Sequence, residues 1–191
     1  MNPIERYEPL VDDPAAFRAA CDRPLPSVVR TNTLAASPDR VREAFTEAEI
    51  THEPVAWHDG LFRLPDGHPG RNWPHVHGWT HGQEEVSVLP GIALDPDPGD
   101  RVWDACAAPG SKTTQIADAM NDAGTLVAND NNLGRLSALR HNAERLGVTC
   151  AVVTNQDARN FSTKPLAFDE FDRALVEPPA RVREPVGRTR T

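Results

Sequence analysis

The sequence predicts an α/β protein, in which a doubly wound, parallel sheet follows a smaller α+β unit. Two observations support this. From Arg101 onward, strand-like and helix-like segments alternate, which is typical of parallel sheets. Upstream of residue 65 the order is instead helix, strand, helix, strand, strand. Prolines and glycines gather at residues 65–74 and 95–99, so we interpret the first stretch as a loop and the second as a turn before a strand.

The α+β unit is expected to span residues 1–82. Asp13 and Ser37 each precede a proline, a pattern that caps a helix and then starts it. The second helix has one apolar face, because its hydrophobic residues follow the helical period. Residues 28–34 (VVRTNTL) are rich in β-branched side chains and predict a strand, and residues 54–57 and 61–64 predict two shorter ones. The expected apolar face consists of Val41, Ala44, Phe45 and Ala48.

The parallel-sheet unit is expected to span residues 83–180, with a basic tail at 181–191. Its second helix should stop at Gly147, a residue suited to the left-handed position after a helix. Doubly wound sheets bind nucleotides at the carboxyl ends of their strands. The predicted strands are residues 101–106, 125–129, 151–154 and 172–176, and the predicted helices begin near residues 112 and 133.

Length and composition narrow the class of protein. With 191 residues and 39% hydrophobic residues, the chain can form one domain or two small ones. It has no run of 18 apolar residues, so we expect no membrane span, and its acidic N-terminus does not resemble a secretory signal. Cys21, Cys106 and Cys150 are widely spaced and odd in number. This favours a reducing cytoplasm over a disulfide framework.

The charge is unusual. Acidic residues number 28 against 20 basic ones, and Lys112 and Lys164 are the only lysines. A net charge of -8 argues against nucleic-acid binding, yet an acidic, lysine-poor surface also suits a halophile-like, high-salt cytoplasm. The charge therefore does not decide whether RNA is a partner.

The segment from Asp104 to Thr114 (DACAAPGSKTT) has the features of a polar-ligand site built from backbone. A strand ends, small residues allow close approach, and a helix begins with free N–H groups. Asp130 follows the second strand, where its carboxylate could bind the hydroxyls of a ribose, and Asp157 follows the third, within reach of an adenine amino group. Each acid alone could be a solvated side chain, but three strand ends in register favour a nucleoside cofactor.

Two other nucleotide loops do not fit. A P-loop requires glycine where Cys106 and Ser111 stand, and the dinucleotide pattern G-x-G-x-x-G is absent. The loop sequence therefore argues against ATP and NAD as ligands.

These motifs resemble the NOP/Sun-type RNA 5-methylcytosine methyltransferases. The resemblance is carried by DACAAPGSKTTQ, AND (128–130), NQDAR (155–159), FDRALVE (171–177), QEEVSVLP (83–90) and RTNTL (30–34). It implies a Rossmann-like class I methyltransferase domain behind a small RNA-recognition-motif-like domain. It also implies S-adenosyl-L-methionine as cofactor and tRNA or rRNA as partner, with methyl transfer to C5 of a cytosine.

The resemblance also implies the cofactor contacts. The loop from Cys106 to Lys112 would surround the methionine part, Asp130 would bind the ribose and Asp157 the adenine. Ser111 stands where the family usually has a second glycine, which is tolerable if its φ is negative. The expected cofactor-binding residues are Cys106, Ala107, Ala108, Pro109, Gly110, Ser111, Lys112, Asp130, Asp157 and Glu177.

The fourth family motif, Asp-Ala-Pro-Cys-Ser, is altered. It aligns with residues 177–181, where Glu177 lengthens the acid and Ala180 replaces the cysteine. In the family a later motif supplies the nucleophilic cysteine, whose thiolate adds to C6 of the cytosine. Neither family cysteine is found here, so we predict no catalytic residue. Cys150 is expected to be a core residue and Cys106 part of the cofactor loop.

The resemblance ends after Val176, before a segment with Arg181, Arg183, Arg188 and Arg190. We expect a gene truncated or shifted in frame near codon 177, and a catalytically silent fragment that binds at most cofactor or RNA. The alternative is a short basic RNA-binding tail.

Three further patterns have weaker interpretations. His75, His77 and His81 could suggest zinc, but no cysteine or acid accompanies them at a fixed spacing, so we predict no metal site. Trp73 and Trp79 could stack on RNA bases, although a domain junction is the preferred interpretation. The segment EPPA lacks the Asn or Asp and the aromatic residue of amino-directed methyltransferases.

Overall fold

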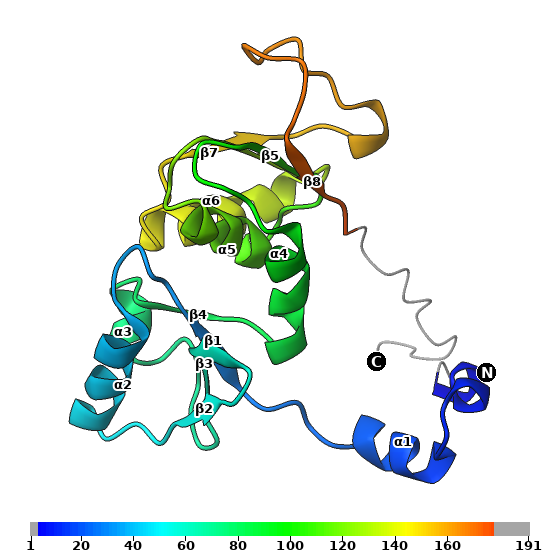
Figure 1. Cartoon of the computed structure of the whole chain (residues 1–191), viewed down its shortest axis with the longest axis vertical. Coiled ribbons are helices and arrows are strands. Elements are labelled where there is room, and N and C mark those ends of the chain that lie inside the picture. Colours follow the sequence, from blue (N-terminus) through cyan, green and yellow to red (C-terminus); the bar gives the residue numbers. More distant parts are fainter. Residues whose placement is uncertain (1–3, 178–191) are drawn as a thin grey trace, which may run out of the picture.

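The computed structural model describes residues 4–177, and the predicted basic tail and Ala180 lie outside this range. Two four-stranded sheets are found in this part of the chain, one antiparallel and one parallel (Figure 1). The helices of the parallel sheet lie between its strands and the first sheet. No helix within the described range is long and apolar enough to cross a membrane.

The first sheet has the strand order β2-β3-β1-β4, with every neighbouring pair antiparallel. Along the chain the order is strand, helix, strand, strand, helix, strand. Val29 of β1 and Phe62 of β3 pack against Val41 and Phe45 of α2 to form the core on one face. The elements are β1 (Val28–Thr31), α2 (Pro38–Glu47), β2 (Glu53–Val55), β3 (His58–Arg63), α3 (Trp73–Val76) and β4 (Thr80–Gly82).

Both predicted helix starts in this region are confirmed. The Asp13 carboxylate accepts a 2.9 Å hydrogen bond from Ala16 N and caps α1 (Pro14–Cys21). The Ser37 hydroxyl accepts one of 3.3 Å from Arg40 N and caps α2. The helix α1 follows the short turns η1 (Ile4–Arg6) and η2 (Glu8–Leu10) and buries no side chain, so it adds nothing to the core.

Several predicted boundaries in the first unit are wrong. The first strand ends at Thr31 instead of residue 34, because the Asn32 side chain donates to Gly78 O at 2.7 Å and to Leu146 O at 2.9 Å, which turns the chain. The helix α3 begins at Trp73, inside the predicted loop, and the Asn72 side chain caps it. The strand β4 was not predicted, because three residues are too few for a period to be visible.

The second sheet has the order β7-β6-β5-β8 and is parallel throughout. The predicted bounds of β6 and β7 are confirmed, while β5 and β8 are shorter than expected. Gly147 has a φ of 72°, as expected for the residue that follows α6. The elements are β5 (Arg101–Asp104), α5 (Ser111–Ala119), β6 (Thr125–Asn129), η4 (Leu133–Arg135), α6 (Leu136–Arg145), β7 (Ala151–Thr154), η5 (Ala158–Asn160) and β8 (Arg173–Leu175).

The order of the parallel sheet determines where a ligand can bind. The chain adds β6 and β7 on one side of β5 and then returns to place β8 on the other side. The connections therefore diverge at the carboxyl ends of β5 and β8, and such a reversal opens a crevice above the sheet.

The two sheets are joined by buried polar contacts. The Arg30 guanidinium lies 2.7 Å from an Asp118 carboxylate oxygen, with both side chains almost fully buried. Asp118 also accepts a 2.9 Å hydrogen bond from Thr33 N. Two further elements connect the sheets along the chain, η3 (Glu85–Val88) and α4 (Leu89–Leu94). The first unit is thus fixed to α5, the helix that follows the predicted cofactor loop.

Candidate functional site

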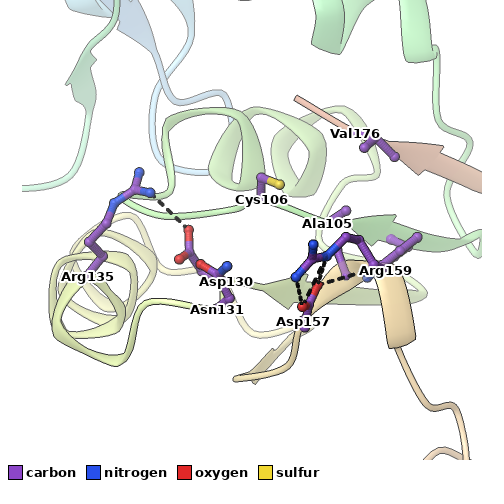
Figure 2. A pocket seen from close by; sticks show the side chains of 10 residues that line it. Ala105, Cys106, Asp130, Asn131, Arg135, Asp157, Arg159 and Val176 are labelled. Carbon is purple, nitrogen blue, oxygen red and sulfur yellow. Dashed lines mark hydrogen bonds and ion pairs between the residues drawn. The ribbon is translucent and has the colours of Figure 1, made fainter. Parts of the chain in front are cut away.

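A pocket of about 400 Å³ opens at the carboxyl ends of β5, β6 and β7. It brings together three of the predicted site residues, Cys106, Asp130 and Asp157, one from each strand end (Figure 2). The remaining wall comes from aromatic, aliphatic, amide and arginine side chains. The full lining is Trp103, Ala105, Cys106, Asp130, Asn131, Arg135, Asp157, Ala158, Arg159 and Val176.

The loop after β5 is held by its own backbone. Ala107 N donates to Asn129 O at 2.7 Å, and Gly110 N donates to Ala107 O at 2.7 Å. Gly110 has a φ of 106°, and a Cβ there would lie 2.9 Å from Leu139 Cδ1, so this position requires glycine. Ser111 is the first residue of α5 and is not among the residues with positive φ, which satisfies the condition for the departure at this position.

Asp130 is buried where the second strand ends. Its side chain is 3% exposed and accepts hydrogen bonds from Ala108 N at 3.2 Å and Asn132 N at 2.8 Å. The Arg135 guanidinium lies 3.3 Å away and also donates to Ala108 O. The carboxylate is therefore fixed in one orientation at the pocket wall, with negative charge stabilised by backbone N–H groups.

Asp157 is held differently. It caps η5 by accepting a 3.0 Å hydrogen bond from Arg159 N, and the Arg159 guanidinium pairs with it at 2.5 Å. The Arg159 side chain is the main cause that lowers the pKa of Asp157 to about 2. The carboxylate is thus ionised at neutral pH, at a site open to solvent.

The predictions missed Asn129, which ties the three strand ends together. Its side-chain N–H groups donate to Ala105 O at 3.1 Å and Gln156 O at 2.9 Å. Its side-chain oxygen accepts from Thr154 Oγ1 at 3.0 Å and Gln156 N at 2.9 Å. The residue is completely buried. All four hydrogen-bonding positions of this amide are used, so Asn129 fixes the spacing between the loops that carry Cys106 and Asp157.

A second hollow, of about 380 Å³, lies on the other side of the loop and shares Cys106 with the pocket. It contains the remaining predicted residues except Gly110, whose part is to form the turn. Lys112 Nζ lies 2.7 Å from a Glu177 oxygen and 3.3 Å from Ser87 Oγ. The predicted residues that line it are Cys106, Ala107, Ala108, Pro109, Ser111, Lys112 and Glu177.

Asp104 is the buried acid of this second hollow. Burial raises its pKa to about 6, against the opposing effect of a 2.7 Å hydrogen bond from Thr113 Oγ1. The carboxyl is therefore partly protonated near neutral pH. It lies at the end of β5, at the start of the loop, and it was not among the predicted cofactor ligands.

The thiols of Cys106 and Cys150 are not activated. Burial and the nearby Asp130 and Asp104 carboxylates raise the pKa of Cys106. Burial and Asp122 raise the pKa of Cys150 to about 12, and this residue packs against the core of the second sheet, as expected. Neither thiol provides a thiolate at neutral pH.

In the segment rich in histidine and tryptophan, the side chains of His81 and Trp79 contact other parts of the protein. Arg145 Nη2 donates to His81 Nδ1 at 2.9 Å, so His81 Nε2 carries the proton donated to Ser111 Oγ at 3.0 Å. Burial and neighbouring positive charges lower the pKa of His81 to about 3, which keeps it neutral. Trp79 packs on the core of the first sheet, so its expected place at a domain junction is wrong.

Comparisons with known proteins show the family to which the chain belongs. The family model described as "16S rRNA methyltransferase RsmB/F" matches residues 91–190. The chain belongs to this methyltransferase family. This match extends beyond Val176, the residue after which we expected the resemblance to end. Members of this class use S-adenosylmethionine, and the expected family and cofactor are therefore confirmed.

Two curated relatives illustrate the similarity. The chain is 35% identical over 179 residues to a tRNA (cytosine(49)-C(5))-methyltransferase of Pyrococcus abyssi, covering 92% of this chain and 56% of the relative. It is 37% identical over 182 residues to the ribosomal RNA small subunit methyltransferase F of Vibrio atlanticus, covering 92% of this chain and 38% of that protein. The chain thus spans 38% and 56% of the length of these two relatives.

Solved structures confirm the Rossmann-like methyltransferase fold. A methyltransferase homolog from Pyrococcus horikoshii is 27% identical, with a TM-score of 0.69 over 83% of this chain and 58% of that one. The fold is also shared with NSun6 from Pyrococcus horikoshii, solved with SFG, at 15% identity and a TM-score of 0.80 over 94% of this chain and 70% of that one.

Proposed function

We propose that this chain forms the S-adenosylmethionine-binding part of an RNA cytosine-C5 methyltransferase. The observation that supports this most directly is the convergence of three strand ends on one pocket. There Asp130 would bind the ribose hydroxyls and Asp157 the adenine amino group, while the loop from Cys106 to Lys112, with Glu177, would surround the methionine part.

The pocket suits a nucleoside in both size and chemistry. Its volume of about 400 Å³ lies within the range of small-molecule sites. Asp130 presents a buried carboxylate, and carboxylates are suited to paired hydroxyl donors. The Trp103 indole N–H is buried without a hydrogen-bond partner among the described residues, and Trp103 lines this pocket. An unpaired buried donor in the wall supports the presence of a polar ligand.

Two observations bear on the reaction. The similarity to a tRNA (cytosine(49)-C(5))-methyltransferase supports cytosine C5 as the target atom and RNA as the partner. The bound cofactor would supply an electrophilic methyl group, and attack from C5 requires a thiolate to add to C6. The thiols of Cys106 and Cys150 are both shifted toward the protonated form. We therefore propose that residues 4–177 hold the cofactor without forming the covalent bond themselves.

The topology of the first unit supports the expected kind of domain. We infer that residues 1–82 form an RNA-recognition-motif-like domain and that residues 83–180 belong to the cofactor domain. The support is the strand, helix, strand, strand, helix, strand order and the four-stranded antiparallel sheet. The boundary between the units coincides with the end of β4 at Gly82.

Calorimetry with S-adenosylhomocysteine tests the cofactor site, and transfer of a tritiated methyl group to unfractionated tRNA and rRNA tests the silence of this chain. We expect binding without transfer. An absence of binding would refute the cofactor site. Methyl incorporation that is lost in Cys106→Ala or Cys150→Ala would refute the silent interpretation.

A further inference from the structure

The face of the first sheet that an RNA-recognition motif uses for stacking is covered here. Val28, Arg30 and Leu61 lie on the face opposite the core formed with α2. Arg30 pairs with Asp118 and donates to Thr114 Oγ1 at 3.2 Å, both on α5. Val28 and Leu61 pack with Val88 of η3. RNA bases cannot stack on a face that is buried against the cofactor domain, so any RNA contact of this unit lies elsewhere.

The segment between β3 and η3 differs from the rest of this acidic chain. Residues 67–83 contain no Asp or Glu, although the chain has 28 acidic residues and a net charge of -8. The segment includes two of the four tryptophans and four of the seven histidines. Absence of carboxylates removes the main source of repulsion toward phosphates. The basic and aromatic residues concerned are His68, Arg71, Trp73, His75, His77, Trp79 and His81.

Trp73 presents an aromatic ring at the surface of this segment. Its side chain is 37% exposed, and its ring lies 4.9 Å from the Trp79 ring and 5.9 Å from the His77 ring. Trp79 is in turn anchored on the core of the first sheet. The ring of Trp73 is thus supported from behind and partly open to solvent, as a stacking platform requires. Arg71, Val76 and His77 are exposed beside it in the sequence.

This surface is connected to the proposed cofactor site. Arg145 of α6 donates to His75 O at 2.6 Å and to His81 Nδ1 at 2.9 Å, and His81 contacts Ser111 of the cofactor loop. Gly82 lines the second hollow, and a Cβ at that position would lie 3.1 Å from Pro69 Cβ. The segment that includes this surface thus extends, at Gly82, to the hollow that contains Lys112.

We propose that Arg71, Trp73, Val76 and His77, named here the α3 surface, bind an unpaired RNA segment that flanks the target nucleotide. Trp73 stacks on a base and Arg71 contacts a phosphate. The inference rests on the proposed function, since it takes RNA to be the substrate. It locates RNA recognition at the loop and helix beside the sheet, because the sheet face is buried.

The test measures the affinity of the whole chain for a fluorescently labelled, unstructured RNA oligonucleotide by anisotropy, in Trp73→Ala and Arg71→Ala. The matched control is Trp57→Ala, because Trp57 is a 47% exposed tryptophan of the same unit outside the α3 surface. We expect Trp73→Ala to weaken binding about 5- to 150-fold, as loss of one stacked base predicts. Arg71→Ala should reduce the slope of log Kd against log salt by about 0.7.

Further variants and ligands separate the possible failures. Trp73→Tyr should retain most of the affinity, and urea unfolding of each variant controls for loss of fold. Equal affinity in Trp73→Ala and Trp57→Ala, with S-adenosylhomocysteine still bound, overturns the α3 surface and leaves the cofactor site intact. Binding of S-adenosylhomocysteine without any RNA binding overturns both the α3 surface and RNA as partner of this chain. Loss of affinity for heparin equal to that for RNA in Trp73→Ala overturns base stacking.

Discussion

The two carboxylates that face the pocket are held in different ways. Asp130 is 3% exposed and receives two backbone N–H groups, whereas the Asp157 side chain is 38% exposed and pairs with Arg159. The Asp130 carboxylate is held by backbone groups of the surrounding chain. The second depends on one side chain that is itself 86% exposed, so it can exchange this partner for a ligand.

Because of this difference, we expect the two ends of the proposed cofactor to contribute differently to binding. At Asp130 the geometry is formed before a ligand arrives, which lowers the entropic cost of binding. At Asp157 the ion pair with Arg159 has to rearrange if an adenine amino group is to donate to the carboxylate. Affinity should therefore depend more on the buried end, and discrimination between bases more on the exposed end.

We expect the largest effect from removing the side-chain amide of Asn129, which sets the distance between the loops that carry the two carboxylates. Asn129→Leu keeps the approximate size but leaves Ala105 O and Gln156 O without their donor inside the protein. Buried groups without partners cost about 1–3 kcal/mol each, so we expect the free energy of unfolding to fall by on the order of 3 kcal/mol. Urea unfolding measures this.

The control for this substitution is Asn131→Leu, which changes the same residue type at an exposed position two residues away. It should leave the urea midpoint almost unchanged. Equal stability of the two variants would show that the buried amide does not hold the strand ends together, and the contrast between a fixed and an adaptable carboxylate would lose its structural basis.

Asp130→Ala tests the fixed end directly. A hydrogen-bonded carboxylate of this kind contributes about 1.5–3 kcal/mol, so affinity for S-adenosylhomocysteine should fall about 10- to 150-fold. Calorimetry gives the dissociation constants. Unchanged affinity would remove Asp130 from the ribose position, whatever the effect on stability.

Gly110→Ala tests the turn that presents the loop to the ligand. A left-handed backbone costs a residue with a Cβ about 1–2 kcal/mol, which should appear in the free energy of unfolding. Gly99→Ala is the matched control, because Gly99 has a similar φ of 99° but no atom within 4 Å of an added Cβ. Both variants should lose stability, and Gly110→Ala alone should lose affinity for S-adenosylhomocysteine. Equal affinity in both would show that the turn does not shape the site.

The parallel sheet was largely predictable from the sequence, and the first unit less so. The strands β6 and β7 are short apolar runs between clear helix patterns, so local composition determines their bounds. In the first unit, β1 ends where Asn32 reaches Leu146, a contact with a distant part of the chain that no local pattern contains. Boundaries that depend on such contacts are not visible in sequence periodicity.

The same distinction holds within the site. Asp130 and Asp157 could be proposed because acids that follow strands in a parallel sheet meet at one edge. Asn129 could not, since its side chain is paired with Ala105, Thr154 and Gln156, and these partners depend on the register of three strands. Arg159 carries a local signal, because it lies two residues from the acid it pairs with, but such pairs are common on surfaces.

The smallest expected effect is that of changing the exposed end. Asp157→Ala should weaken binding of S-adenosylhomocysteine by no more than about fivefold, because the carboxylate is solvated and already paired. Arg159→Ala should change the affinity less than this, since it leaves the carboxylate in place. A loss in Asp157→Ala as large as in Asp130→Ala would remove the contrast between the two ends.

Arg159→Ala also has a pH signature. Pairing with Arg159 lowers the pKa of Asp157 from 3.8 to about 2, so the folded state binds this proton less tightly than the unfolded chain does. The resulting stabilisation is fully present above about pH 4 and is lost as the pH falls through about 2. In Arg159→Ala the pKa should return toward its ordinary value, which a carboxyl NMR titration measures. The difference in unfolding free energy between wild type and Arg159→Ala should therefore shrink as the pH is lowered from 5 toward 2. A difference that stays constant over this range would mean that Arg159 acts through packing, and that Asp157 is not held by its charge.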